Sequence, residues 1–435
     1  MNWQMTVAAA IFLVTFGLII SEKIHRALAA IVGAITMVTV GHFMGFMQFE
    51  TVVKSIDWNT LGLLLGMMII VGILGETGAF EYVAIKTAKL AKGNLWRIMM
   101  FFVIVTALVS AFLDNVTTVL LMAPVTISIA KTLNVNPVPF IVTEVLASNI
   151  GGTATLIGDP PNILIGSAAG IPFNAFLVYL APIVVVILVF SLIFFRIYFR
   201  RDLGVKPSNI GEVMDMDERQ AIKDRPLMVK GMAVFGVVVV LFVLHDLLEL
   251  PLSLVALAGA TAFLVMSYWH PDRAMKHVEW TTLMFFAALF VVVEGLNGAG
   301  IITTLGGWFA NLSGGNLLTA SVIMLWFSGI AATFIGNIPL TIALIPLVKI
   351  MVATPGLSVA AGVVNPIWWA LSLGACMGGN GFIFSAPANV IVAGISERMG
   401  MPISFRKFAS VSLPTLFISL AISTGMLYLI DFALT

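Results

Sequence analysis

The sequence has little charge, and the charge it has is nearly balanced. Only 10% of its 435 residues are Asp, Glu, Lys or Arg, and the net charge is +1. Soluble domains carry about 25% charged residues, so a soluble globular fold is excluded. The near-neutral balance argues against a nucleic-acid partner. The one cysteine, Cys376, excludes an intrachain disulfide.

The sequence also lacks the motifs of enzymes and metal centres. It contains no HExxH, no P-loop and no nucleophile elbow, so an enzyme is not expected. His245 and His277 show no metal-ligand spacing, so neither a metal nor a cofactor is expected. The apolar run at 4–20 is followed, not preceded, by Lys23 and Arg26. It is interpreted as a retained span and not a signal peptide.

Long apolar stretches are abundant. A helix of about 20 apolar residues crosses the hydrocarbon layer of a bilayer, and backbone groups in lipid must be satisfied within helices. The sequence therefore predicts an all-α, polytopic protein of the lipid bilayer. The main uncharged stretches are residues 4–20, 27–48, 59–75, 175–195, 231–244, 252–269, 280–293 and 408–430.

One cassette occurs twice: residues 57–166 are echoed by residues 279–393. Asp57-Trp58-Asn59-Thr60-Leu61 matches Glu279-Trp280-Thr281-Thr282-Leu283 at an offset of 222, and Pro160-Pro161-Asn162 matches Pro387-Ala388-Asn389 at an offset of 227. The matched residues are helix breakers and amides in very apolar sequence. A doubled, interrupted helical segment is typical of secondary transporters.

Each cassette predicts a re-entrant hairpin followed by a broken helix. The hairpins are expected at 98–131, folded at Asp114-Asn115, and at 317–350, folded at Gly336-Asn337. The broken helices are expected at 138–168 and 362–395. Pro160 and Pro387 lack an N–H, and adjacent glycines allow tight backbone approach.

Lys and Arg predict the topology by the positive-inside rule. The basic segments 80–97 and 196–230 are expected in the cytoplasm, and the stretch 298–320, without Lys or Arg, outside. The N-terminus is then outside, all Lys and Arg except Lys54 and Lys349 are cytoplasmic, and the cassettes run in opposite directions as an inverted repeat. A multi-pass protein of the cell inner membrane is expected. The predicted divisions are N-terminal scaffold spans (1–56), a first repeat (57–199), a cytoplasmic linker (200–230), further scaffold spans (231–278) and a second repeat (279–435).

An inverted repeat brings both hairpin tips and both breaks together near the membrane midplane. Broken helices expose N–H groups that suit an anion and C=O groups that suit a cation. A plain helix kink without a ligand is the alternative for each break, but matched breaks favour a binding site. The predicted substrate- and ion-binding residues are Asp114, Asn115, Thr117, Thr118, Asn149, Gly151, Gly152, Thr153, Asp159, Asn162, Asn337, Gly378, Gly379, Asn380, Ser385 and Asn389.

Three carboxylates are candidates for the coupling ion, H⁺ or Na⁺. Asp114 and Asp159 correspond to Gly336 and Ala386, so both charges come from the first half. A carboxylate at the bilayer centre costs at least ~2.5 kcal/mol unless it is protonated, paired or hydrated. The alternative is that each caps a helix fragment. Glu144 is interpreted either as a proton relay or, with more weight, as a residue at the cytoplasmic entrance. Cys376 is interpreted as a packing residue near the site.

Two runs carry a resemblance to a known family. Ser110-Ala111-Phe112-Leu113-Asp114-Asn115-Val116-Thr117-Thr118 and Ser148-Asn149-Ile150-Gly151-Gly152-Thr153 through Pro160-Pro161-Asn162 resemble the ion-transporter superfamily, closest to the P-protein and arsenite-permease (ArsB/NhaD) branch. The resemblance covers nearly the whole chain. It implies a homodimer, a scaffold with a moving transport domain, and elevator-type alternating access.

The resemblance leaves several cargoes open. Proton-coupled efflux of arsenite, antimonite or a similar small hydroxylic acid or inorganic anion is the first candidate, and Na⁺/H⁺ antiport is the second. Sodium-coupled carboxylate transport is disfavoured, because the tips lack the Ser-Asn-Thr of that branch and no arginine lies near them in the sequence. A channel is also disfavoured, since inverted broken-helix repeats favour alternating access.

Overall fold

The computed structural model describes residues 3–21, 23–360 and 362–434, and every regular element in these ranges is a helix. By length and composition, nine of the described helices can cross a membrane. The first half contains α1 (Trp3–Ser21), α2 (Arg26–Phe43), α3 (Phe49–Ser55), α4 (Trp58–Glu76), α5 (Ala79–Leu90), α6 (Leu95–Ser110), α7 (Asn115–Thr132), α8 (Val138–Gly152), α9 (Pro160–Ala169) and α10 (Phe173–Tyr198).

The linker and the second half contain the remaining helices. The linker holds η1 (Asp202–Gly204), α11 (Ile210–Asp215) and η2 (Glu218–Ala221). The second half contains α12 (Arg225–Leu244), α13 (Leu252–Ser267), α14 (Pro271–Ala274), η3 (Met275–His277), α15 (Trp280–Gly298), α16 (Ile301–Leu312), α17 (Leu317–Ile335), α18 (Asn337–Ala353), α19 (Pro366–Gly378), η4 (Ile383–Ser385), α20 (Pro387–Arg398) and α21 (Phe405–Leu434).

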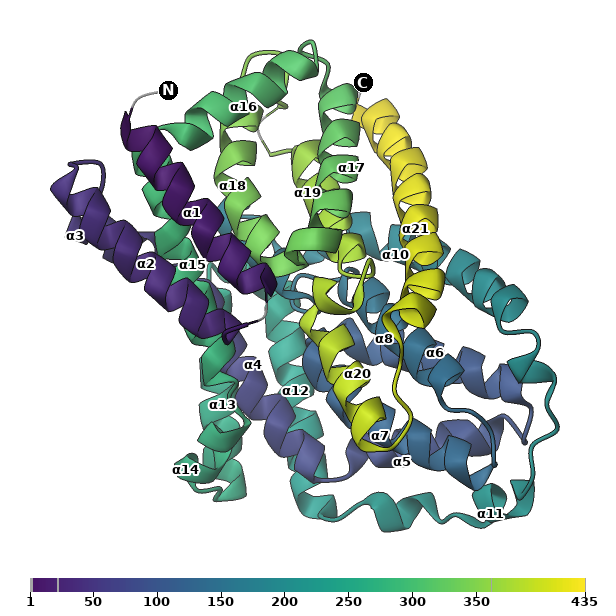
Figure 1. Cartoon of the computed structure of the whole chain (residues 1–435). Helices are drawn as coiled ribbons and strands as arrows, with labels where there is room; N and C mark the ends of the chain where they lie inside the picture. Colours follow the sequence, from purple (N-terminus) through teal and green to yellow (C-terminus); the bar gives the residue numbers. More distant parts are fainter. Residues whose placement is uncertain (1–2, 22, 361, 435) are drawn as a thin grey trace.

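The two repeats run in opposite directions. Glu76, at the end of α4, forms an ion pair with Arg273, which lies just before α15 begins, so α4 ends near the place where α15 starts. Figure 1 shows α5 at the end of the molecule that carries α11, and α16 at the other end. The start of α1 and the end of α21 lie at the α16 end. Which end is cytoplasmic stays a prediction from the Lys and Arg distribution.

Local signals explain where matched helices begin. Asn94 and Asn316, 222 residues apart, each accept a hydrogen bond from the backbone N–H of the third residue of the helix that follows, at 3.0 and 2.8 Å. Such caps satisfy N–H groups that the helix itself leaves unpaired. Gly78 and Gly300 both have φ of 82° and precede α5 and α16. These two short helices were not predicted, because 80–97 and 298–320 were interpreted only by their charge.

The hairpin arms pack tightly on the first segments of the broken helices. Gly151 of α8 lies against Ala107 of α6, where an added Cβ would meet the carbonyl oxygen at 2.2 Å. Gly378 of α19 lies against Gly329 of α17 in the same way, with an added Cβ 2.6 Å from the Gly329 carbonyl oxygen. Only glycine permits this approach. It holds each hairpin tip beside the break that follows it.

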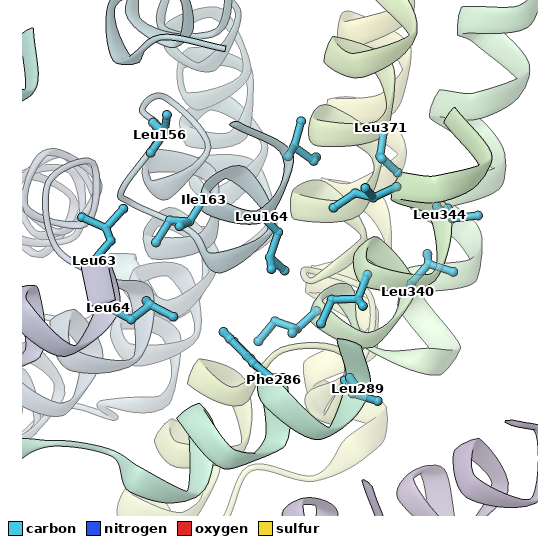
Figure 2. Close-up of a cluster of buried hydrophobic side chains, with 14 of the residues drawn as sticks. Leu63, Leu64, Leu156, Ile163, Leu164, Phe286, Leu289, Leu340, Leu344 and Leu371 are labelled. Atoms are coloured by element: carbon cyan, nitrogen blue, oxygen red, sulfur yellow. The ribbon is translucent and has the colours of Figure 1, made fainter. Parts of the chain in front are cut away.

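Two sets of helices can be distinguished by their packing. One set contains α1, α2 and α15 together with α4, α12 and α13; the other contains α6–α10 and α17–α21. A layer of buried side chains lies where α4 and α15 meet α9, α18 and α19 (Figure 2). Its apolar surfaces pack the two sets against each other. The labelled side chains are Leu63, Leu64, Leu156, Ile163, Leu164, Phe286, Leu289, Leu340, Leu344 and Leu371.

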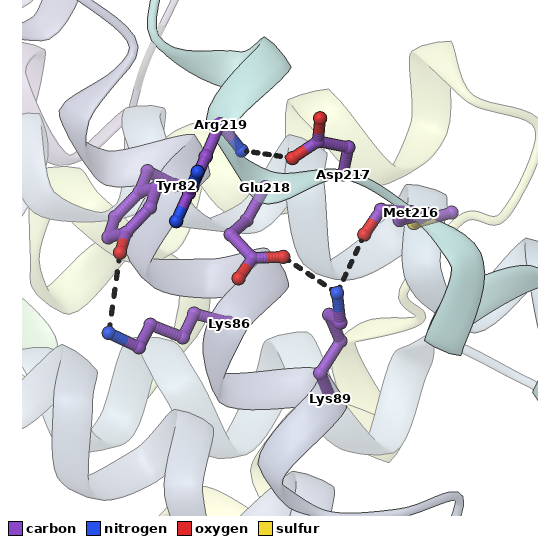
Figure 3. A network of polar contacts seen from close by, with 7 residues as sticks. All are labelled: Tyr82, Lys86, Lys89, Met216, Asp217, Glu218 and Arg219. Carbon is purple, nitrogen blue, oxygen red and sulfur yellow. Dashed lines mark hydrogen bonds and ion pairs between the residues drawn. The ribbon is translucent and has the colours of Figure 1, made fainter.

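The linker is fastened to α5 by polar contacts at the surface. Lys89 Nζ lies 2.7 Å from Glu218 Oε2 and donates to the Met216 carbonyl oxygen at 2.9 Å (Figure 3). The hydrogen bond from Lys89, with its charge, holds the pKa of Glu218 below its ordinary value. The connection between the halves is therefore attached to the first repeat.

Candidate ion and substrate site

The first hairpin turns at residues 111–114 and the second at Gly336. Asp114 precedes α7 and accepts hydrogen bonds from Thr117 N at 2.9 Å and Thr117 Oγ1 at 2.5 Å. Gly336 has φ of 97°, a conformation that other residues rarely adopt, and α18 begins at the next residue. Each tip thus places an asparagine, Asn115 or Asn337, at the first position of a helix.

Each break is fastened by an asparagine from the helix that follows it. Asn162 Nδ2 donates to the carbonyl oxygens of Thr153 at 3.0 Å and Thr155 at 2.8 Å. Asn389 Nδ2 donates to those of Gly379 at 2.8 Å and Phe382 at 2.9 Å. A break leaves carbonyl groups without helical partners. These amides satisfy them, so both breaks are ordered structures.

Asn149 links the two repeats. Its Oδ1 accepts from Asn115 Nδ2 at 3.0 Å, and its Nδ2 donates to Asn380 Oδ1 at 2.9 Å and Asn389 Oδ1 at 3.1 Å. These asparagines are almost fully buried. The hydrogen bonds join the first tip to the second break, as the inverted repeat predicts.

Asp159 lies where the two tips meet. Its Oδ1 accepts from Asn115 Nδ2 at 3.2 Å and from Asn337 Nδ2 at 3.5 Å, and the residue is 0% exposed. Its Oδ2 has no hydrogen-bond partner among the described residues, nor have Asn115 Oδ1 and Thr118 Oγ1. Buried polar atoms are normally paired. Asp159 and Asn115, which are hydrogen-bonded to each other, thus both carry an unpartnered oxygen that a cation or a proton would satisfy, and Thr118 lies one turn further along α7.

The two candidate aspartates differ. Asp114 directs both carboxylate oxygens to Thr117, the N-cap that was the alternative interpretation, and the residue is only half-buried. Asp159 also precedes a helix but makes no cap hydrogen bond. The contacts therefore favour Asp159 over Asp114 as the candidate ion-binding carboxylate.

Glu144 does not lie at an entrance, and that interpretation is wrong. It is 1% exposed, accepts from Thr126 Oγ1 at 2.8 Å and Thr106 Oγ1 at 3.5 Å, and has an unpartnered Oε2. One helical turn further along α8, Ser148 Oγ pairs with Ser110 Oγ at 2.9 Å and donates to the Asn115 carbonyl oxygen at 3.3 Å. A row of polar groups thus leads from Glu144 to the first tip.

The remaining predicted residues support the backbone of the site. Thr153 Oγ1 donates to the Asn149 carbonyl oxygen at 2.9 Å, and Ser385 Oγ to that of Thr333 at 2.6 Å. Gly152 would place a Cβ 2.5 Å from the Gly158 oxygen, and one at Gly379 would lie 3.3 Å from Asn337 Nδ2. These residues shape the turns and bring the amides together.

Residues of α19 also reach the site, and sequence analysis missed one of them. Ser372 Oγ donates to Asn162 Oδ1 at 2.5 Å, and Cys376 Sγ lies 3.4 Å from the same oxygen. Cys376 corresponds to Asn149 in the repeat, so its place near the site follows from the offset. Ser372 corresponds to Val145, and the repeat gives no signal for it.

A cavity of about 350 Å³ adjoins the second tip, and an arginine is among the residues that line it. The expectation from the sequence that no arginine lies near the tips is therefore wrong. Arg26 begins α2, far from Asn337 in the chain, and no local pattern reveals that they line one cavity. The cavity is lined by Ile19, Ile20, Ile24, His25, Arg26, Phe285, Phe334, Ile335, Gly336, Asn337, Ile338, Pro339, Phe384, Ser385, Pro387, Val390 and Ile391.

The carboxylate of Glu279 lies near Arg26. Glu279 precedes α15; burial and then the nearby Asp114 carboxylate raise its pKa, while Thr282 and Arg26 oppose the shift. Arg26 also lies over the Phe285 ring, 5.7 Å from its centroid. The α1–α2 corner, the first tip and the start of α15 are thus electrostatically connected.

Together these features define a membrane transporter: apolar helices enclose two hairpin tips and two broken helices that share buried polar contacts. The chain belongs to the citrate transporter family (CitMHS), whose profile matches residues 16–374. The resemblance to the ion-transporter superfamily is confirmed at this level.

Three relatives support the assignment of the chain to a transporter family. An uncharacterized transporter of Mycobacterium tuberculosis is 42% identical over 98% of this chain and 99% of its own. A 46 kDa membrane protein of Mycobacterium leprae is 41% identical over 97% and 98%. The human P protein is 34% identical over 98% of this chain, which spans 60% of that longer protein. The family and these relatives place the chain among multi-pass transporters and not among enzymes, and the bacterial relatives favour an inner membrane.

A solved structure shares the fold. The YdaH transporter of Alcanivorax borkumensis, described as having an unusual topology, superposes with a TM-score of 0.60 over 88% of each chain. The sequence identity is 16%, so the similarity shows the fold alone.

Proposed function

We propose that the chain is a secondary active transporter that moves a small, oxygen-rich solute by alternating access and couples this movement to a cation at Asp159. The observation that carries the proposal is the group of unpartnered oxygens: Asp159 Oδ2, Asn115 Oδ1 and Thr118 Oγ1. A fully buried carboxylate without a cationic partner is costly in a membrane protein, so it marks a functional site.

A proton is the first candidate for the coupling ion. Protonation would neutralise Asp159 in its buried position, and deprotonation would restore the charge when the site opens to water. Inward proton flow would then drive export of the cargo. Uncharged hydroxylic acids such as arsenous, antimonous or silicic acid suit the amides and hydroxyls of the site, as do small anions.

Sodium is the second candidate, and the number of oxygens favours it. Na⁺ prefers hard oxygen ligands, which a carboxylate, an amide and a hydroxyl supply at adjacent positions. Asn115 begins α7 and Thr118 lies one turn later, so both can face the same ion. A Na⁺/H⁺ antiporter would use these oxygens without any other cargo. A sodium-coupled carboxylate transporter is a third candidate, favoured by Arg26 in the adjoining cavity.

Asn337 connects the ion to the cargo. It lines the cavity beside the second tip, and its Nδ2 is 3.5 Å from Asp159 Oδ1. A change of charge on Asp159 alters how strongly this amide is held, and with it the position of the tip. Binding at one place then changes binding at the other, which is the requirement for coupling.

Alternating access requires one part of the protein to move against another. We propose that α6–α10 and α17–α21 form the moving part, and that α1, α2, α4, α12, α13 and α15 form the scaffold, in an elevator-type motion within a homodimer. The grouping is supported by the packing of the helices. The apolar layer between α4, α15 and the opposite set suits sliding, because its contacts are not directional.

The test uses purified protein in liposomes that contain a pH-sensitive dye. Sodium, arsenous acid, silicic acid and citrate are added in turn to the wild type, Asp159→Asn and Asp114→Asn. We expect at least one solute to move protons in the wild type and in Asp114→Asn, and none in Asp159→Asn. Unchanged proton movement in Asp159→Asn would remove the proposed role of this residue.

A further inference from the structure

Glu144 is a buried carboxylate that the proposed transport step does not use. It lies in the middle of α8, where Thr106 of α6 and Thr126 of α7 both donate to its Oε1. Its Oε2 is buried and has no hydrogen-bond partner among the described residues. A carboxyl group in such a place is costly inside a membrane unless it is protonated, paired or hydrated.

Pairing with a cation does not neutralise Glu144. Among the described residues, no ion pair includes it. The helices packed on α8 are α6, α7, α10, α19, α20 and α21, and Asp114, which caps α7, adds a further negative charge. The other titratable groups on these helices are the buried Cys376 and three tyrosines, of which Tyr179 stacks on Trp369 while Tyr198 and Tyr428 are exposed. The charged side chains of these helices whose exposure is described are all exposed: Arg97, Lys131, Arg196, Glu397, Arg398, Arg406 and Lys407.

The second repeat shows that the frame does not need polar groups at these positions. Thr106 corresponds to Ser328, whose hydroxyl donates to carbonyl groups of its own helix. The other counterparts are buried and apolar, so the same packing of hairpin and broken helix forms without a carboxylate. They are Leu371 for Glu144, Val348 for Thr126, Ala332 for Ser110 and Ala375 for Ser148.

Ser110 and Ser148 bring Glu144 close to the first tip. Thr106 and Ser110 are four residues apart on α6, and so are Glu144 and Ser148 on α8, so the members of each pair lie on one helix face. Because the Ser148 hydroxyl donates to the Asn115 carbonyl oxygen, Ser110 is the donor in the 2.9 Å contact between the two serines. Asn115 Nδ2 in turn donates to Asp159 Oδ1. Glu144 is thus one helical turn from a hydrogen-bonded chain that ends at Asp159.

Glu144 is closed off from solvent in this conformation. A narrow gap between α6, α7 and α8 is lined by Thr126 and, toward the connection between α7 and α8, by Leu133 and Val135. The gap has no room for a water molecule. The connection itself lies against the linker, since the Ser208 N–H donates to the Leu133 carbonyl oxygen at 3.0 Å. Parting of α6, α7 and α8 at this place would give Glu144 a path to solvent at the linker end of the molecule.

We propose that Glu144 is a proton-binding site of the transporter, separate from the cation site at Asp159. While the cation site is empty, the like charges of two buried carboxylates disfavour each other, and Glu144 holds a proton. A cation at Asp159 removes this repulsion, and Glu144 releases its proton. Only the O–H bond of the carboxyl group forms and breaks, and the proton is exchanged with solvent.

This inference rests on the proposed function, because it places the cation at Asp159. It adds that the proton and the cation oppose each other although they occupy different residues. The contrasting arrangement is a single shared site, in which sodium displaces a proton from Asp159 itself. The two arrangements differ in what the loss of the Glu144 carboxyl does to proton release.

The test measures proton release from purified protein in a weakly buffered detergent solution that contains a pH-sensitive dye. Sodium chloride is added near neutral pH, with choline chloride as the control for ionic strength. The wild type is expected to release about one proton per bound sodium ion. Glu144→Gln should release several-fold fewer protons, yet sodium should still raise its unfolding temperature, because the cation site is intact.

A second variant and a spectroscopic signal separate a proton site from a structural role. Glu144→Leu copies Leu371 of the second repeat, so it keeps the test valid if Glu144→Gln does not fold, and the same loss of proton release is expected. In the wild type, the infrared C=O band of a protonated carboxyl group should weaken when sodium is added. Both variants should lack this response, whereas a Glu144 that only supports the fold would give no band that responds to sodium.

Glu294→Gln is the matched control. Glu294 is a partly buried glutamate of α15 that accepts from Asn297 at 3.4 Å and lies outside the hydrogen-bonded chain. Its variant should release protons as the wild type does. Proton release by Glu144→Gln and Glu144→Leu equal to that of the wild type, or no release by the wild type, would overturn the proposal.

Asp159→Asn separates this proposal from the proposed function. Loss of both sodium binding and proton release in Asp159→Asn, with loss of proton release alone in the Glu144 variants, would support both. If Asp159→Asn binds sodium and releases protons as the wild type does, the cation site of the proposed function is wrong. Loss of proton release in the Glu144 variants would then still identify Glu144 as the proton site.

Discussion

The two repeats have the same frame and different chemistry. Asn115 and Asn337 begin the second arms of the hairpins, and Asn162 and Asn389 fasten the breaks with equivalent hydrogen bonds. At the centre, however, Asp159 corresponds to Ala386, Asn149 to Cys376 and Thr118 to Leu340. The amides at helix ends are required by both breaks, because each break exposes backbone groups. The carboxylate occurs only once, as the proposed single coupling site requires.

The largest effect is expected when the charge is moved to the other repeat. Asp159→Ala should abolish coupling, and Asp159→Ala with Ala386→Asp should not restore it. The relocated carboxylate would lie beside the second tip, where Leu340 offers no oxygen in place of Thr118. Proton or sodium movement per transported solute in liposomes is the measurement, with Ala386→Asp alone as the control. Restored coupling would show that the halves are chemically equivalent.

A more selective change removes one oxygen from the proposed site. Thr118→Val keeps the shape but loses the hydroxyl, which is fully buried and has no partner among the described residues. An unsatisfied buried hydroxyl costs about 1–3 kcal/mol, so the ion-free variant should unfold at a higher temperature than the ion-free wild type. The same variant should need several-fold more coupling ion for half-maximal transport.

Thermal unfolding in detergent at varied sodium concentration and pH measures both effects. Leu340→Thr, the equivalent position in the second repeat, is the matched control and should not change ion dependence. If Thr118→Val lowers the stability of the ion-free protein, the hydroxyl has a structural partner and does not serve the ion.

The shared frame predicts equal losses from the two fastening amides. Asn162→Ala and Asn389→Ala each leave buried carbonyl oxygens without a donor, at a cost of about 1–3 kcal/mol each. The expected result is a similar fall in unfolding temperature for both variants. Asn316→Ala, at a cap on the exposed end of α17, is the control with a smaller loss. A large loss from one amide alone would mean that the breaks are not equivalent.

The smallest effect is expected outside both repeats, where the linker meets α5. Lys89 lowers the pKa of Glu218, so this contact is complete above the ordinary glutamate value of 4.5 and is lost as the pH falls through the lowered pKa. Glu218→Gln should speed proteolysis of the linker near neutral pH and leave transport unchanged. Glu212 is an exposed glutamate of the same linker, and the protease should cut the linker of Glu212→Gln at the wild-type rate. Altered transport in Glu218→Gln would assign the linker a role in the motion.

The repeat made much of the frame predictable. Offsets of 222 and 227 place proline, glycine and asparagine at matching positions, and these residues act locally, through missing N–H groups, tight turns and capping amides. Helix breaks and tips therefore follow from the sequence. The helices α5 and α16 also have a local signal in Gly78 and Gly300, which the charge pattern obscured.

The chemistry of the site was less predictable, for two different reasons. Asp114 has Thr117 three residues later, a local capping pattern that distinguishes it from Asp159 and could have been recognised. Arg26 and Ser372 have no such signal, because they approach the site through the packing of distant helices. Glu144 was misplaced for the same reason: its position near a helix start does not reveal that α6 and α7 cover it.

The most direct test is whether an ion gradient drives the cargo uphill in liposomes. The wild type should accumulate the transported solute when a proton or sodium gradient is imposed. Asp159→Asn should only equilibrate the solute across the membrane, and it should still exchange the solute in a counterflow assay without an ion gradient. Asp114→Asn should accumulate the solute as the wild type does. Gradient-driven accumulation in Asp159→Asn equal to that of the wild type would contradict the assignment of the coupling site.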